Sequence, residues 1–202
     1  LMGCMLSAAS CNKWWAEEIL GTKDFAAEQA PIQKLGENHV FFLPYLMGER
    51  SPHNDPDARG VFFGLSAMHT KKHMLRAVME GVAYSLRDCV EVFREMGINV
   101  SDMMACGGGG TSPLWRSMLA DLYGCEVKTP ASKEGPALGA ALLASVGAGI
   151  YGSVPEAVKA VVRTDKVCQP DSSRMERYDE FYSLYREIYP ALKDSFSRLA
   201  TL

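Results

Sequence analysis

The chain has 202 residues, of which 48% are hydrophobic and 22% charged, values that are typical of a globular domain. Its net charge of -3 gives no basic surface for nucleic acid. The longest apolar stretch, around residues 137–150, is too short and too rich in small residues to span a bilayer, and no signal peptide opens the chain. We therefore expect a cytoplasmic protein with neither a nucleic-acid nor a membrane partner.

The six cysteines do not form a metal-binding pattern. None stands in a Cys-x-x-Cys pair, and no cluster of histidines accompanies them. Several stand in apolar runs, as Cys106 does, which is typical of buried free thiols in a reducing cytoplasm. The sequence therefore predicts no metal ligands.

The first residues are an apolar run that does not begin with methionine. We predict a short strand over Met2–Leu6, followed by a helix through Trp14, Trp15 and Ile19 that ends at Gly21. Because natural domains seldom begin inside a strand, we interpret the chain as part of a longer protein. A processed or trimmed terminus is the alternative. A cut there leaves a sheet edge open, so we expect Met2–Leu6 to contact another chain.

Two short strands flank a long polar loop. Val40–Leu43 is rich in β-forming residues and ends at Pro44, and Gly60–Leu65 is predicted as a strand or bend bounded by glycine. The loop Gly48–Gly60 is long for a compact domain, and such loops are usually functional or flexible. The earlier segment, Thr22–Asn38, is predicted to be irregular.

The polar loop contains side chains that can do chemistry. His53 can act as a general acid or base, and Asp55 and Asp57 can hold magnesium. Glu49 and Arg50 are a neighbouring pair that either orients a phosphate or holds the loop. Since the sequence shows no partner for His53, we interpret it as structural and the two aspartates as a solvated turn.

A long helix is predicted from Thr70 to Gly97, because apolar residues recur at three-to-four spacing between them. Gly81 inside this helix costs roughly 1 kcal/mol relative to alanine, so we expect a close contact at that position. Pro155 starts a short helix, and a last helix begins near Asp171. We interpret the aromatic stripe of that last helix as core packing rather than as a partner-binding face.

A strand over Met103–Cys106 leads into four consecutive glycines, Gly107–Gly110. Ligands of open α/β sheets bind at such strand ends, and glycines let a flat or anionic ligand touch the backbone. The next helix, capped by Ser112 with Pro113 in its first turn, directs free N–H groups to the same place. The Gly-Lys-[Ser/Thr] ending of a Walker loop is missing. We predict ligand contact at this run rather than a flexible turn.

Further elements complete the pattern. Cys125–Lys128 is predicted as a strand and Ala137–Val146 as a helix of small residues. Glycine and alanine at helical spacing over residues 133–141 allow either a tightly packed helix pair, which is the commoner cause, or close approach to a nucleotide. Strands alternate with helices along the chain, which predicts an α/β fold with a mainly parallel sheet.

Taken in order, these segments resemble the FGGY family of carbohydrate kinases, and the resemblance covers nearly the whole chain. The family's C-terminal signature is similar to Gly60–Leu65, His73-Met74 and Ala77–Glu80. Its adenosine motif is similar to the glycine run with Ser112, Trp115, Arg116 and Met118–Asp121, and its last block to Glu134–Ala141. Phe42–Leu46 and Gly48–Asn54 resemble xylulokinases most, and gluconokinases carry a similar loop.

The resemblance implies an actin-like, ribonuclease H-like ATPase fold, with a mixed sheet flanked by helices. It implies that residues 1–202 are the C-terminal, nucleotide-binding domain, and that the sugar-binding domain and the general-base aspartate lie upstream of Leu1. Family members transfer the γ-phosphoryl group of ATP to a sugar hydroxyl, the 5-hydroxyl of D-xylulose in xylulokinases. The implied cofactors are ATP and Mg²⁺, and the implied partners are ATP and a small sugar, with a homodimer left open.

The resemblance also implies an adenosine site, and it assigns no catalytic residue and no metal ligand to this chain. The residues carried over are Gly107, Gly108, Gly109, Ser112 and Pro113, with Ala9 and Lys13 facing the nucleotide from the first helix. Pro113 replaces a side-chain donor that some relatives use, so a contact with the base there is made by backbone or packing only.

Three hypotheses follow for the whole protein. The first is a xylulokinase-like enzyme, of which the isolated chain is expected to be inactive and to bind ATP weakly. The second is a gluconokinase or another sugar or polyol kinase. The third is a non-catalytic actin-like module that binds nucleotide without turnover.

Overall fold

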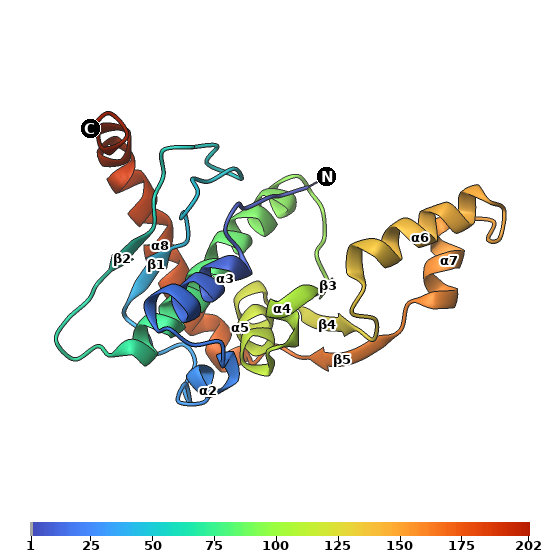
Figure 1. Ribbon diagram of the computed structural model, residues 1–202, viewed down its shortest axis with the longest axis horizontal. Coiled ribbons are helices and arrows are strands. Elements are labelled where there is room, and N and C mark those ends of the chain that lie inside the picture. Colours follow the sequence, from blue (N-terminus) through green and yellow to red (C-terminus); the bar gives the residue numbers. More distant parts are fainter. Residues whose placement is uncertain (1) are drawn as a thin grey trace.

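A 25-residue helix, α3 (Lys71–Glu95), runs through the centre of the protein (Figure 1). The computed structural model describes residues 2–202. The elements before α3 are α1 (Ala9–Trp14), a π-helical segment (Trp15–Ile19), α2 (Phe25–Gln29), β1 (Phe41–Leu43) and β2 (Val61–Phe63). Those after it are β3 (Asp102–Met104), α4 (Gly107–Thr111), α5 (Pro113–Tyr123), β4 (Glu126–Pro130), α6 (Gly135–Gly147), α7 (Val154–Val161), β5 (Thr164–Cys168) and α8 (Ser172–Leu199).

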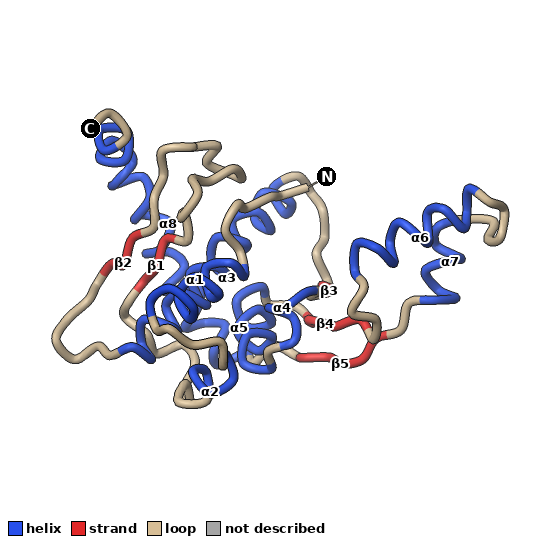
Figure 2. The backbone as a smooth tube through the Cα atoms, in the orientation of Figure 1, coloured by secondary structure: helices blue, strands red, loops and turns tan. Residues whose placement is uncertain are grey.

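The strands form two small sheets, which Figure 2 shows on either side of the helical centre. In the first, β1 pairs antiparallel with β2. In the second, β4 lies between β3, to which it is parallel, and β5, to which it is antiparallel. The sheet is mixed, as the family resemblance implied, and the expectation of a mainly parallel sheet was wrong. The reason is β5, an edge strand whose exposed polar residues give no strand signal in the sequence.

Gly81 is the point at which the first sheet approaches α3. A Cβ atom at Gly81 would collide with the carbonyl oxygen of Phe42 and lie 3.0 Å from its carbonyl carbon. Phe42 is 1% exposed, and its ring packs against that of Phe62 with the centroids 4.6 Å apart and the planes tilted by 38°. The close contact expected at this glycine is therefore confirmed, and it places β1 directly on the helix.

The last helix, α8, covers α3 with its aromatic side chains. The hydroxyl of Tyr178 donates a hydrogen bond to Glu80 at 2.9 Å, and that of Tyr182 donates to Asp88 at 2.6 Å. All four side chains are buried. The aromatic stripe thus packs in the core, as predicted, and it also supplies the donors that the buried carboxylates of α3 need.

The first residues do not form the strand predicted for Met2–Leu6. Residues 2–5 have no regular secondary structure, and a backbone hydrogen bond of 3.0 Å joins the amide of Ser51 to the carbonyl of Cys4. A Cβ atom at Gly3 would lie 2.6 Å from that of Cys89 on α3. The segment is held against a helix and a loop, where no strand edge is available for pairing. Its contact with another chain stays a prediction.

Other elements follow the prediction with shifted ends. The first helix begins at Ala9, and Gly21 follows its π-helical end with a positive φ of 66°. The short helix α2, capped by Asp24, replaces part of the segment predicted to be irregular. The small-residue helix α6 forms as predicted, and it packs on α7.

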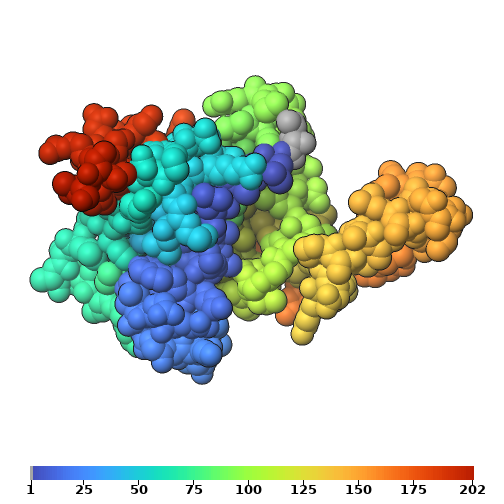
Figure 3. Space-filling model, turned by 45° about the horizontal axis from the view of Figure 1, so that its top comes forward, coloured from blue at the N-terminus to red at the C-terminus, as the bar shows by residue number. Residues whose placement is uncertain are grey.

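Helices α6 and α7 protrude from the body as an arm (Figures 1 and 3). Leu142 is the buried residue of α6, whereas Leu143 is 61% exposed. Within residues 2–202, no helix combines the length and the apolar character that crossing a membrane requires.

We expect Gly81→Ala to lower the free energy of unfolding by about 1–3 kcal/mol, because the added methyl overpacks the contact with Phe42. Gly139→Ala in α6 is the matched control. Nothing lies within 4 Å of a Cβ there, so alanine should be neutral or add up to about 1 kcal/mol through helix propensity. Urea denaturation of both variants measures the difference. Equal effects of the two substitutions would contradict the close contact.

A second prediction concerns pH. Burial raises the pKa of Glu49 to about 7, that of Glu80 to about 7 and that of Asp88 to about 6. Each folded-state pKa lies above the unfolded value, so the folded chain binds more protons than the unfolded chain between about pH 4 and 7. We therefore expect these groups to lower stability as pH rises through that window.

Glu49→Gln should remove the part of this pH-dependent loss of stability that Glu49 causes. Between pH 5 and 7.5 the free energy of unfolding should fall by roughly 2 kcal/mol less in this variant than in the parent chain. Glu176→Gln, an exposed position on α8, is the control and should follow the parent. Denaturation curves at several pH values test this, and parallel pH profiles for Glu49→Gln and the parent would refute it.

Candidate nucleotide-binding site

The glycine run forms a short helix, α4, rather than the open loop that the sequence suggested. Gly107 has a positive φ of 73°, which turns the chain from β3 into this helix. A Cβ atom at Gly110 would lie 2.5 Å from the carbonyl oxygen of Ala105. Arg116 closes the other end, because its Nη1 donates to the carbonyls of Gly110 and Thr111 at 2.7 and 3.0 Å. The fold itself therefore requires the first and the last glycine.

The two middle glycines have no such requirement. A Cβ atom at Gly108 would meet nothing within 4 Å, and one at Gly109 would meet only ordinary contacts, with Trp115 at 3.4 Å and Ala9 at 3.9 Å. Neither has a positive φ. The fold would therefore tolerate a residue larger than glycine at these two positions.

A pocket of about 630 Å³ lies on one side of the glycine run, between α1, α2 and the start of α5. We call it the α1 pocket. It brings together six of the seven residues predicted for the adenosine site: Ala9, Lys13, Gly108, Gly109, Ser112 and Pro113. Segments about 100 residues apart in sequence thus meet at one place.

The start of α5 is firmly placed beside the α1 pocket. The Ser112 hydroxyl accepts a hydrogen bond from the amide of Trp115 at 3.2 Å and donates one to Oε1 of Gln29 at 2.7 Å. The indole of Trp115 donates to the carbonyl of Met79 at 3.1 Å, which joins α5 to α3. The predicted helix cap at Ser112 is therefore present, and its hydroxyl also links α5 to α2.

Asn12 and Gln29 line the pocket, and sequence reasoning did not select either of them. Oδ1 of Asn12 is buried without a hydrogen-bond partner in the part of the chain that the structure describes, although the residue lines the α1 pocket. Gln29 comes from α2, a helix within the segment predicted to be irregular. Both residues thus bring a side-chain amide to the lining of the α1 pocket.

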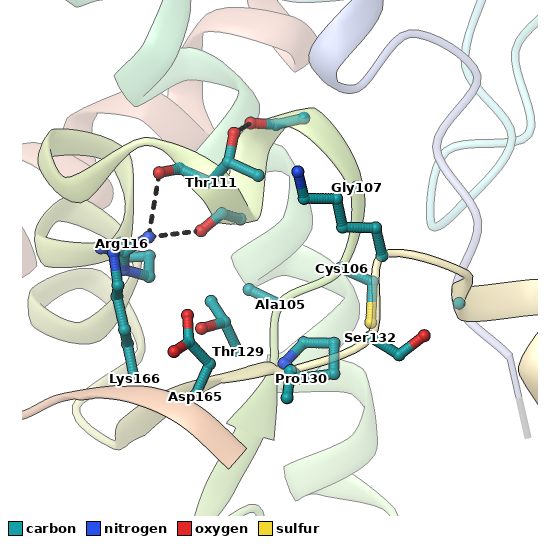
Figure 4. A pocket seen from close by; sticks show the side chains of 15 residues that line it. Ala105, Cys106, Gly107, Thr111, Arg116, Thr129, Pro130, Ser132, Asp165 and Lys166 are labelled. Carbon is teal, nitrogen blue, oxygen red and sulfur yellow. Dashed lines mark hydrogen bonds between the residues drawn. The ribbon is translucent and has the colours of Figure 1, made fainter. Parts of the chain in front are cut away.

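A second pocket, of about 530 Å³, lies on the other side of the glycine run (Figure 4). We call it the β4 pocket, because its floor is the end of β4 and the loop that follows. Gly107, the seventh predicted residue, lines the β4 pocket and not the α1 pocket. Gly108 and Thr111 line both pockets, so the glycine run is the wall between them.

The polar loop 48–60 lines neither of these pockets. The His53 ring stacks on Tyr189 with centroids 3.9 Å apart, and burial lowers its pKa. Asp55 accepts a hydrogen bond from the hydroxyl of Tyr189 at 2.7 Å, and its backbone pairs with that of Glu49. These contacts support the structural interpretation of His53. Asp55 is 8% exposed, so its interpretation as part of a solvated turn was wrong.

The metal-ligating side chains of residues 2–202 are dispersed. No group of three or more His, Cys, Asp or Glu side chains in that range is arranged to hold a metal ion. The α1 pocket is lined by no carboxylate from the same residues. Lys13, the cation among the predicted adenosine contacts, has its Nζ atom 3.8 Å from Oε2 of Glu17.

Comparison with known proteins matches the chain to one family. The profile of the FGGY family of carbohydrate kinases, C-terminal domain, matches residues 2–148. Xylulose kinase from Staphylococcus epidermidis is 35% identical over 203 residues, covering 100% of this chain and 41% of that protein. Xylulose kinase from Escherichia coli is 40% identical over 195 residues, covering 95% of this chain and 40% of that protein.

Solved structures agree with this match. Ligand-bound xylulose kinase from Lactobacillus acidophilus superposes with a TM-score of 0.88 at 29% identity, over 98% of this chain and 40% of that one. Gluconate kinase from the same organism superposes with a TM-score of 0.87 at 28% identity, with the same coverage. The chain spans about two-fifths of the length of these relatives. It has their actin-like fold, and it belongs to the FGGY family of carbohydrate kinases.

Proposed function

We propose that the chain is the ATP-binding part of a sugar kinase, and that the α1 pocket holds the adenosine of ATP. The observation that carries this proposal is the open backbone at Gly108, together with the convergence of six motif residues on one pocket. The fold needs no glycine at Gly108, so a ligand that touches the backbone accounts for it. Family membership makes a nucleotide the natural ligand.

The walls of the α1 pocket suit a flat base with polar edges. Phe25, Pro113 and Trp115 supply apolar surface, whereas Asn12 and Gln29 supply amide groups. A pocket that is mostly apolar with a few fixed polar groups is the usual form of a small-molecule site. Because Pro113 has no N–H, it contributes packing and no hydrogen-bond donor to the base.

The chemical step needs groups from outside this chain. Phosphoryl transfer depends on a positioned base or nucleophile and on Mg²⁺ to neutralise the developing charge. With no carboxylate lining the α1 pocket from residues 2–202, we place the general base and the Mg²⁺ ligands in the part of the enzyme that this chain does not span. The isolated chain is then inactive and binds ATP weakly.

We further propose D-xylulose as the sugar and D-xylulose 5-phosphate as the product, made in the cytoplasm. Seven similar proteins from six species are named xylulose kinase, and they cover 93–100% of this chain. A gluconokinase from Bacillus licheniformis is 34% identical over 82% of the chain, which keeps gluconate as the second candidate. A non-catalytic nucleotide-binding module would share the pocket and show no turnover.

Gly108→Leu should weaken ADP binding to the chain at least tenfold, because the new side chain occupies open space beside the pocket without meeting the fold. Gly139→Leu is the control, since it adds the same side chain to another helical glycine with nothing within 4 Å. Calorimetric titration measures both dissociation constants. Retained ADP affinity in Gly108→Leu would place the nucleotide elsewhere.

A chimera tests the division of labour between this chain and the rest of the enzyme. Residues 2–202 replace the matching part of the Staphylococcus epidermidis xylulose kinase, and ATP-dependent phosphorylation of D-xylulose is measured. We expect turnover from the chimera, loss of most of it with Gly108→Leu, and none from the isolated chain. Turnover by the isolated chain would contradict the proposal, as would a folded chimera that binds xylulose but never phosphorylates it.

The choice of sugar needs a longer protein that contains this chain in its own context. Its kcat/KM should be higher for D-xylulose than for D-gluconate. The reverse order would establish the gluconokinase alternative, and the absence of turnover with any sugar or polyol would establish the non-catalytic module.

A further inference from the structure

The β4 pocket holds a buried cation that the fold leaves without a counter-ion. Arg116 is 6% exposed, and among the hydrogen bonds of residues 2–202 it contributes its Nη1 atom alone, to two backbone carbonyls. No carboxylate of residues 2–202 lies within 4 Å of its guanidinium nitrogen atoms. A buried charge without a partner is costly, so such a group normally pairs with an opposite charge.

Further positive charge points to the same place. Figure 4 shows the side chain of Lys166, from β5, extending toward Arg116. Lys133, in the loop before α6, also lines the β4 pocket. Asp165 is the opposing charge, so three cations face one carboxylate across the pocket. Like charges repel at short range, and an anion bound between the cations would offset this repulsion by attracting each of them.

Thr129 supplies an independent sign of a ligand. It is 7% exposed, and its hydroxyl has no hydrogen-bond partner among the described residues. Figure 4 shows its side chain pointing into the pocket, between Asp165 and Ala105. Buried hydroxyls without partners are rare in folded proteins, because each forfeits the hydrogen bond that it makes in water.

The backbone around the β4 pocket also offers donors. The 13-residue helix α6 begins at Gly135, which lines the pocket, and no side chain caps its first amides. Nothing would lie within 4 Å of a Cβ atom at Gly107 or Gly108, so the backbone is open there. Free amides at a helix start favour an anion.

We propose that the β4 pocket binds a phosphate group, which Arg116 and Lys166 hold by charge and Thr129 by its hydroxyl. A planar guanidinium with free N–H groups matches phosphate oxygens. The pocket is separated from the α1 pocket by the glycine run and does not depend on the kinase assignment. The phosphate belongs either to the tail of a nucleotide bound across that run or to a separate phosphorylated molecule.

The test is a titration of the 202-residue chain with inorganic phosphate at constant ionic strength, followed by calorimetry. We expect saturable binding, and Lys166→Gln should raise the dissociation constant by about tenfold, the loss expected for one charge-assisted hydrogen bond. Lys159→Gln, an exposed position on α7, is the control and should leave it unchanged. Absence of saturation, or equal affinity in Lys166→Gln and the parent, would overturn the proposal.

Two further variants should change phosphate affinity in opposite directions. Asp165→Asn removes the opposing carboxylate and should tighten phosphate binding, whereas weaker binding would mean that the pocket prefers a cation. Thr129→Val keeps the shape of the side chain and removes the orphan hydroxyl. It should weaken phosphate binding without lowering the free energy of unfolding of the phosphate-free chain. A loss of stability with unchanged phosphate affinity would show that Thr129 is only structural and would overturn its role.

The source of the phosphate is found by repeating the titration with saturating adenosine or ADP. Competition by ADP but not by adenosine identifies the nucleotide tail, and competition by neither identifies a separate phosphorylated molecule. If phosphate binds in the predicted way while ADP does not bind at all, the phosphate site stands and the proposed nucleotide function alone fails.

Discussion

Two buried carboxylates on α3, Glu80 and Asp88, depend on hydroxyl donors from α8. The tyrosines that reach them, Tyr178 and Tyr182, lie one helical turn apart on α8, and the carboxylates lie two turns apart on α3. Without these donors the two acids would be buried with fewer partners, and burial already raises both pKa values. These two hydrogen bonds hold α8 against α3. The candidate site is in turn built on elements that pack against α3.

Contacts of α3 also position the glycine run. This helix also receives β1 at Gly81, and the carbonyl of its Met79 accepts the indole N–H of Trp115. Trp115 lies in the first turn of α5, so its bond to α3 positions the adjacent Ser112 and the glycine run. A rigid helix thus supports a short wall of four glycines with a pocket on each side. Gly108 and Thr111 line both pockets.

The sequence was informative where a motif or a period carried the structure. The spacing of apolar residues predicted α3, the Ser112-Pro113 pair predicted the start of α5, and Gly81 predicted a close contact. The family motifs predicted six residues that share the α1 pocket. Composition was less reliable at the chain's edges, because an apolar run such as Met2–Leu6 becomes a strand only beside a partner.

What the sequence could not reveal depends on tertiary contacts. The strand β5 is exposed and polar, so its pairing with β4 leaves no hydrophobic pattern to detect. Lys166 enters the β4 pocket only because of that pairing. The missing carboxylate partner of Arg116 and the orphan hydroxyl of Thr129 likewise become visible only when the neighbours of each atom are known.

The proposed adenosine pocket and the proposed phosphate pocket are separated by the glycine run. A crystal structure of the chain with ADP would locate the nucleotide relative to this run. We expect the adenine in the α1 pocket, against Pro113 and the helix that carries Ala9 and Lys13, with the ribose side of the nucleotide over Gly108. Adenine in the β4 pocket, or ADP bound away from the glycine run, would rule out the adenosine site proposed for the α1 pocket.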